Sequence, residues 1–267
     1  MTPTLHRFAG RCPPRGLIFL GAARRKIAFF SLTVVGRVRV GLIATGMTLL
    51  SACGNTPPAP DWQANSLGAM KSFTSAYLAG DSKVADFEFA RTRNEISATG
   101  RPELLARAEL VRCAARLASL ELDNCAAMQL NAPDLAPPER AYALFLDSGR
   151  AGSPGGALDA SQVALLPEQH RPMFSARDDN ARVATLTSMV DPLSRLVAAG
   201  VLFSQGQLPP AGVAVAVDTA SDQGWRRPLL AWLGVQLKLA QAAADASAAA
   251  RVQRRIDLAL GGATAKP

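Results

Sequence analysis

The sequence predicts an all-α protein built from stacked antiparallel helical hairpins across residues 61–262. Ala and Leu dominate this region, and aromatic residues make up only 6% of the chain. No stretch sustains the alternation of Val, Ile and Thr that is typical of a β-strand, and we expect Val213–Val217 to form a short helix. Glycine and proline divide the region into short segments, as helical hairpins require. A degenerate helical-repeat solenoid and an irregular helical bundle both fit this pattern.

The first hairpin has the clearest pattern. Apolar residues recur at near-helical spacing in its first segment, namely Trp62, Leu67, Met70, Phe73 and Tyr77. A Gly80-Asp81 turn follows, and the second segment carries Val84, Ala85, Phe89 and Ile96. The spacing predicts two antiparallel helices joined at Gly80.

This hairpin resembles a tetratricopeptide repeat, in which Gly80, Ala85 and Phe89 match the turn glycine, the alanine and the aromatic residue. Thr92 stands where the repeat has alanine, and no 34-residue self-similarity follows. The resemblance implies paired helices that present a concave surface to peptides or proteins.

Later segments carry their own start and stop signals. Four prolines stand where a helix would begin, namely Pro102, Pro138, Pro192 and Pro228. The last hairpin joins a Leu- and Ala-rich helix to a final one that Asp245 can cap. The glycine-rich residues 149–156 predict a flexible joint between 61–148 and 157–262, and a domain boundary there is left open.

The formal charge of +8 comes from the N-terminal segment. Residues 1–52 contain eight Lys or Arg and no acidic residue, which leaves 21 basic and 21 acidic residues in the remainder. Nucleic-acid binding needs an excess of basic residues that neutralise phosphates. We therefore expect no nucleic-acid partner for the remainder. We also expect no cofactor.

A secretory signal is indicated by an uncharged apolar run, 40–50, that directly follows Arg37 and Arg39. The next residues, Leu50-Ser51-Ala52-Cys53, resemble the lipobox of bacterial lipoproteins. The resemblance implies that residues 1–52 are removed and that Cys53 is acylated and anchors the chain in a membrane. The 39 residues before the apolar run exceed an ordinary signal, so we expect an over-extended start, with the true one near Val34.

The residues after Cys53 bear on location and spacing. Gly54 and Asn55 stand where lipoproteins of the inner membrane typically carry Asp, which by resemblance implies the outer membrane, facing the periplasm. The proline-rich residues 53–60 predict a short polyproline-type tether for the domain that follows.

Cys113 and Cys125 remain once Cys53 is lipidated and Cys12 is removed with the signal, and we expect them to form a disulfide. On one continuous helix they would lie about 18 Å apart at 1.5 Å per residue, whereas a disulfide needs Cα atoms within roughly 4.4–6.8 Å. The helix from Pro102 must therefore end near 119–121. Two buried free thiols are the alternative, and a metal site is disfavoured because no other ligand pair accompanies them.

Candidate catalytic residues are sparse. His170 is the only histidine after Cys53, and its position beside Pro167 and Pro172 predicts a surface loop. No Gly-x-Ser-x-Gly motif nominates a serine nucleophile to accompany it. Asp178 and Asp179 could hold a metal, but their position favours the cap of a helix.

Two further groups could bind partners. Arg251, Arg254 and Arg255 share one helix face, for which solvent exposure is the default and contact with anionic lipid the alternative. Trp225 and Trp232 would pack the last hairpin or, if exposed, anchor a protein partner. The sequence thus favours a non-enzymatic, lipid-anchored interaction protein of the bacterial envelope, with a periplasmic hydrolase of unrecognised type as the alternative.

Overall fold

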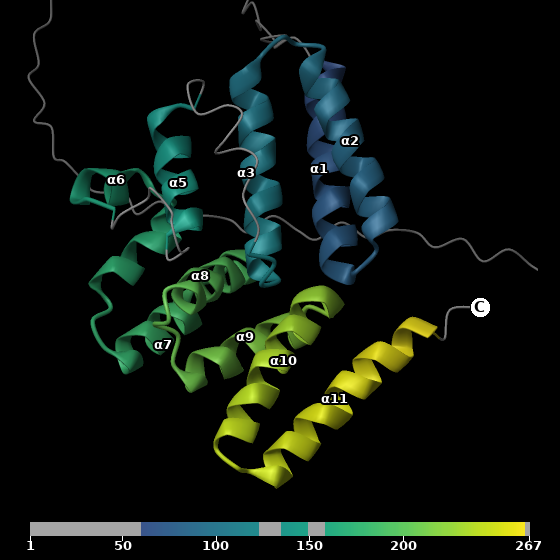
Figure 1. Cartoon of the computed structure of the whole chain (residues 1–267). Coiled ribbons are helices and arrows are strands. Elements are labelled where there is room, and N and C mark those ends of the chain that lie inside the picture. Colours follow the sequence, from purple (N-terminus) through teal and green to yellow (C-terminus); the bar gives the residue numbers. More distant parts are fainter. Residues whose placement is uncertain (1–59, 123–134, 149–157, 265–267) are drawn as a thin grey trace, which may run out of the picture. The chain divides into compact units, whose positions relative to one another are not determined.

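The computed structural model describes residues 60–122, 135–148 and 158–264, and every regular element within these ranges is a helix. The all-α prediction is therefore confirmed (Figure 1). The elements are α1 (Asp61–Ala79), α2 (Ser82–Ser97), α3 (Pro102–Ala118), α5 (Pro137–Asp147), α6 (Ala160–Leu165), the 3₁₀ helix η2 (Glu168–Ser175), α7 (Asp179–Ser188), α8 (Pro192–Ser204), α9 (Pro210–Asp222), α10 (Arg226–Ala242) and α11 (Ala246–Thr264).

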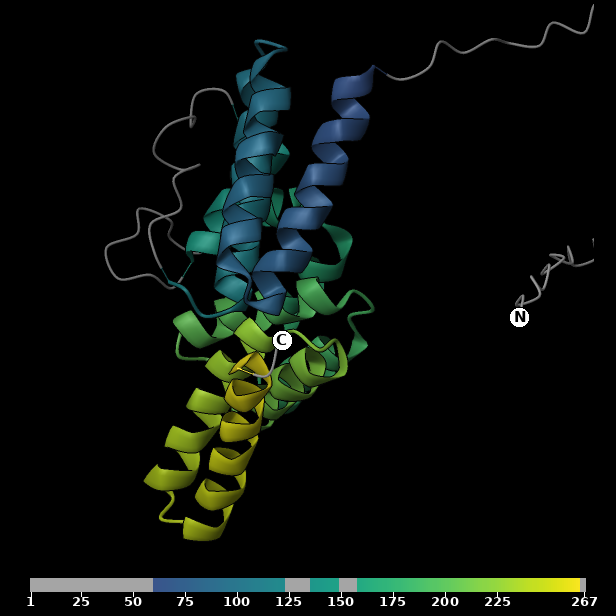
Figure 2. The ribbon, with the colours of Figure 1, turned by 90° about the vertical axis from the view of Figure 1, so that its right-hand side faces the viewer.

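Most helices pack against their neighbours in the chain, as in a helical repeat. α1 packs on α2, α8 on α9, α9 on α10, and α10 on α11 (Figures 1 and 2). Other contacts join helices far apart in sequence, since α3 packs on α8 and α1 contacts α10. A solenoid whose repeats touch only their neighbours would lack these contacts, so the fold combines repeat-like hairpins with a bundle-like centre.

The first hairpin forms as its sequence predicts. Gly80 ends α1 in the left-handed conformation, at φ 89°, and Asp81 caps α2 by accepting a hydrogen bond from the amide of Val84. Phe73 and Phe89 face each other across the pair, with ring centroids 5.1 Å apart. Thr92, which replaces the alanine of the repeat, is buried and donates its hydroxyl hydrogen bond to the carbonyl of Glu88 at 3.0 Å. This local bond satisfies the only polar group that the replacement adds.

Proline marks the helix starts as expected for α3, α5 and α8, each of which carries proline in its first two positions. α10 begins at Arg226, which places Pro228 within its first turn. Val213–Val217 lies inside α9 and is helical, as predicted. Asp245 accepts a hydrogen bond from the amide of Ala248 at 2.9 Å and so caps α11.

One hydrophobic core includes residues from α3, α5, α8, α9, α10 and α11. The glycine-rich residues 149–156 lie outside the described residues, but Phe145 before them and Leu196 after them belong to this same core. At its centre, α8 approaches α3 so closely that a Cβ on Gly200 would lie 2.7 Å from the carbonyl oxygen of Leu117. Only glycine permits this approach without a backbone shift.

Arg227 of α10 joins the first hairpin to the rest of the domain. Its Nε donates to the carbonyl of Tyr77 at 2.7 Å, and its Nη2 donates to the hydroxyl of Ser82 at 2.7 Å. Its Nη1 also pairs with Glu121 at 3.1 Å, and the guanidinium lies 4.3 Å from the centroid of the Tyr77 ring. One side chain thus links α10 to the end of α1, the start of α2 and the segment after α3.

Candidate functional site

An apolar groove of about 200 Å³ lies on the first three helices. Its walls come from three elements: Trp62, Ser66, Leu67 and Met70 of α1, Thr92 and Ile96 of α2, and Leu104, Arg107, Ala108 and Val111 of α3. The start of α1, the end of α2 and the start of α3 meet here because α1 and α2 are antiparallel and α3 follows α2 directly (Figure 1).

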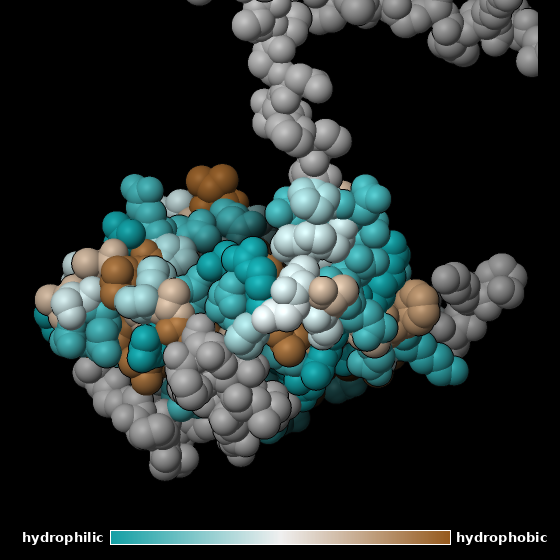
Figure 3. All heavy atoms as spheres, turned by 90° about the horizontal axis from the view of Figure 1, so that it is seen from above, coloured by the Kyte–Doolittle hydropathy of each residue, from teal (hydrophilic) through white to brown (hydrophobic). Residues whose placement is uncertain are grey.

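The groove opens where the hydrophobic stripe of α1 leaves the core. Phe73 and Tyr77 of the predicted stripe are buried, but Leu67 is 56% exposed and Trp62 and Met70 are partly exposed. The stripe is therefore core at its C-terminal end and groove wall at its N-terminal end. Seen from this end of the helices, the surface is mainly hydrophilic, with apolar residues in separate patches (Figure 3).

Among the described residues, Arg107 is the only charged one that lines the groove. Arg107 donates from Nε to Glu139 of α5 at 2.9 Å. Its charge is therefore already paired, and the remaining lining is apolar apart from the hydroxyls of Ser66 and Thr92. Such a lining suits an apolar side chain of a partner, not a polar substrate.

His170 is buried, and the prediction of a surface loop is wrong. The side chain is 1% exposed in η2, where it stacks on Tyr142 with centroids 5.9 Å apart and lies 4.8 Å from the Phe145 ring. Its Nε2 donates to the carbonyl of Ser194 at 3.2 Å. Burial lowers the pKa of the imidazole, although this hydrogen bond opposes the shift. η2 packs on α8 here, and the spacing of residues in the sequence does not reveal this contact.

Asp178 and Asp179 serve the start of α7, as the capping interpretation predicts. The Asp178 carboxylate accepts a hydrogen bond from the amide of Ala181 at 2.8 Å. Asp179 pairs with Arg182 at 2.9 Å. Within the described ranges, no group of three or more His, Cys, Asp or Glu is arranged to hold a metal ion.

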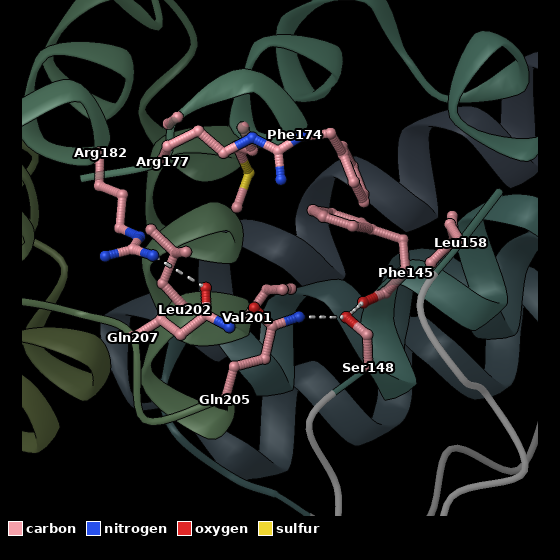
Figure 4. Close-up of a pocket in the computed structure, with 12 residues that line it drawn as sticks. Phe145, Ser148, Leu158, Phe174, Arg177, Arg182, Val201, Leu202, Gln205 and Gln207 are labelled. Carbon is pink, nitrogen blue, oxygen red and sulfur yellow. Dashed lines mark hydrogen bonds between the residues drawn. The ribbon is translucent and has the colours of Figure 1, made fainter. Parts of the chain in front are cut away.

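A second, deeper pocket of about 390 Å³ lies between α5, η2, α7 and α8 (Figure 4). Phe145, Phe174 and Val201 contribute to its apolar wall, and Arg177 and Arg182 lie on one side. His170, Asp178 and Asp179 do not line it, although each is close in sequence to a residue that does. The hydrolase hypothesis relies on those three residues, and none of them reaches the pocket.

Trp232 is a core residue, which corrects the prediction that it could anchor a partner. It is completely buried, its ring meets Phe203 edge-on with centroids 5.7 Å apart, and its Nε1 donates to the carbonyl of Ala118 at 3.0 Å. A partner has no access to this indole. Trp225 precedes α10 and is partly buried. It packs against the hydrophobic core and against a second, smaller cluster that includes Phe73 and Phe89 of the first hairpin, so it joins the last helices to the first.

Arg251, Arg254 and Arg255 are all exposed on α11, as the default interpretation predicts. Arg251 donates to the hydroxyl of Ser247 one turn earlier, at 3.1 Å. Leu258 on the same helix is 79% exposed. Of the helices described, none is both long enough and apolar enough to cross a bilayer.

The cysteines are only partly described. Cys113 is buried on α3, which ends at Ala118 before Leu120 adopts a positive φ of 57°. The chain therefore leaves the helix where a bridge from Cys113 to Cys125 requires it to. Cys125, Cys53 and the signal segment lie outside the described residues, so the disulfide and the lipidation remain predictions.

No known protein family, curated protein or solved structure is significantly similar to this chain. The functional argument therefore depends on the geometry alone. Sequence reasoning missed the apolar groove because the helical spacing of Trp62, Leu67 and Met70 shows one apolar stripe but not what that stripe faces. It missed Arg177 and Arg182 because an arginine beside a capping aspartate normally indicates a solvated helix start.

Proposed function

We propose that this chain is a non-enzymatic interaction protein of the bacterial envelope, in which the α1–α3 groove binds the apolar face of a partner's amphipathic helix. The observation that carries the proposal is the groove itself, an apolar hollow between three helices at the N-terminal end of the domain. A cavity of about 150 Å³ accommodates benzene. The groove of about 200 Å³ can therefore hold one large apolar side chain.

A helix is the preferred form of the partner because the groove runs between helices. Amphipathic helices bind such grooves through apolar residues spaced three or four positions apart. Leu67 at 56% exposure would extend the contact beyond the hollow, while the surrounding polar surface would limit binding to one face.

The lipid tether would set the position of this groove. Only seven residues would separate an acylated Cys53 from Asp61, where α1 begins. A polyproline-type segment rises 3.1 Å per residue, so this tether would reach roughly 20 Å. The groove at the N-terminal end of the domain would then stay near the bilayer, and we propose the periplasmic face of the outer membrane as its location.

Site-specific photocrosslinking in living cells tests the groove. A photoreactive amino acid replaces Leu67 in the groove or, as the matched control, Phe87 of α2, which is 67% exposed and does not line the groove. We expect a protein adduct of one defined mass from position 67 and none from position 87. A third strain combines the probe at position 67 with Val111→Asp, which places a charge in the groove, and we expect it to lose the adduct.

Three results would overturn the proposal. They are the absence of any adduct from position 67, equal adducts from both positions, and an adduct at position 67 that consists of lipid and not protein.

A further inference from the structure

The pocket between α5, η2, α7 and α8 is separate from the groove and has a different character (Figure 4). Its volume of about 390 Å³ lies in the range of pockets that hold small molecules. Most of its wall is apolar, formed by Phe145, Leu158, Met173, Phe174, Val201 and Leu202. The rings of Phe145 and Phe174 lie 6.2 Å apart and supply an aromatic surface.

The polar groups on the α8 side are already satisfied. Gln205 donates from Nε2 to the hydroxyl of Ser148 at 3.0 Å, and that hydroxyl donates to the carbonyl of Phe145 at 2.7 Å (Figure 4). This hydrogen-bonded chain closes one end of the pocket without leaving a free charge there.

The opposite side is cationic. Arg182 donates to Asp179 at 2.9 Å and to Gln207 at 3.4 Å, but its buried Nε has no hydrogen-bond acceptor among the described residues. Arg177, in the part of the chain that the structure describes, makes no hydrogen bond or ion pair with another residue. Among the described residues, no carboxylate lines the pocket. Two guanidinium groups therefore adjoin an apolar chamber. That of Arg182 already pairs with Asp179 but keeps its buried Nε donor unsatisfied, which carries a free-energy cost, and that of Arg177 has no partner among the described residues.

We propose that this pocket binds a small amphiphilic carboxylate, with the carboxylate on Arg177 and Arg182 and the apolar body between Phe145 and Phe174. Guanidinium groups bind carboxylates through short, paired hydrogen bonds. The satisfied polar end and the aromatic walls favour an apolar body over a sugar or a peptide backbone, because buried polar groups of such ligands would lack partners. The site is independent of the groove and of the lipid anchor.

Calorimetric titration of the purified full-length chain tests the proposal, with 4-phenylbutyrate as the probe and 4-phenylbutanol as its neutral counterpart. We expect saturable binding of the acid and at least about tenfold weaker binding of the alcohol, since a charge-assisted hydrogen bond contributes about that factor. Arg177→Gln removes one guanidinium that has no structural partner among the described residues, so it should weaken the acid about tenfold and leave the melting temperature unchanged.

Arg251→Gln on α11 is the matched control, because this arginine is exposed and does not line the pocket, and it should bind the acid like the wild type. Failure of the acid to bind at millimolar concentration would overturn the proposal. Equal binding of acid and alcohol would do the same, as would an Arg177→Gln variant that binds the acid normally.

Discussion

The indole of Trp232 donates a hydrogen bond to the carbonyl of Ala118, 3.0 Å away and 114 positions earlier in the chain. Ala118 is the last residue of α3. The last four carbonyls of a helix receive no hydrogen bond from an amide of the same helix. Trp232 therefore completes the end of α3 from α10 while filling the core. Phenylalanine, leucine or methionine at this position could not donate this bond.

Replacing Trp232 with Phe should lower the free energy of unfolding by about 1–3 kcal/mol, because the buried carbonyl of Ala118 would lose its donor. Chemical denaturation monitored by circular dichroism measures the change. Trp62→Phe is the control, since Trp62 is only partly buried and should change stability by less than about 0.5 kcal/mol. Equal effects of the two substitutions would show that the hydrogen bond is unimportant.

Gly200→Ala should destabilise the domain by about 1–3 kcal/mol, because its Cβ would lie 2.7 Å from the carbonyl oxygen of Leu117 and would force α8 away from α3. Gly234 of α10 is the matched helical glycine, because a Cβ at this position would meet no other part of the fold within 4 Å. Gly234→Ala should stabilise by about 0.5–1 kcal/mol through helix propensity alone. Thermal denaturation of both variants distinguishes the effects, and a stabilised Gly200→Ala would refute the close helix contact.

Stability should fall as the pH is lowered from 7.5 to 5.5, with His170 as a main cause. Burial lowers the pKa of His170 in the folded chain, so below about pH 6.5 the unfolded chain binds a proton that the folded chain does not. Protonation thus favours unfolding across this interval, and the stabilising contribution of the neutral imidazole is fully present only above it. The melting temperature of His170→Gln should depend less on pH over the same interval. An equal pH dependence in both proteins would show that His170 remains solvated.

Local features of this fold can be predicted from sequence, and long-range ones cannot. Asp178 and Asp245 cap helices through amides three residues away, so their roles depend only on nearby sequence. The burial of His170 and Trp232 depends on partners 24 and 114 positions away. No local pattern carries that information. Sequence reasoning therefore places His170 on a surface loop and leaves Trp232 either packed or exposed to a partner.

The candidate sites show the same division. The helical spacing of Trp62, Leu67 and Met70 is evident, but whether that face meets the core or solvent depends on where α3 lies. Arg177 and Arg182 gain their significance only from Phe145 and Val201, which belong to distant helices. The spacing therefore predicts that Trp62, Leu67 and Met70 share one helix face, but it does not predict the groove that they line.

A disulfide between Cys113 and Cys125 should stabilise the domain by about 3 kcal/mol, the magnitude expected for a loop of roughly this size. Mass spectrometry of the non-reduced protein should find the two cysteine peptides joined. Reduction should lower the melting temperature of the wild type but not that of the double Cys→Ala variant. Free thiols at both positions in protein from an oxidising compartment would contradict the prediction.

The lipid anchor is the central claim about where this protein acts, and metabolic labelling with a palmitate analogue tests it most directly. We expect the wild type to be labelled, to fractionate with membranes and to yield no peptide from residues 1–52. Cys53→Ala should lose the label, while Cys113→Ala should retain it. Undiminished labelling of Cys53→Ala, or an unlabelled wild type that retains residues 1–52, would contradict the account.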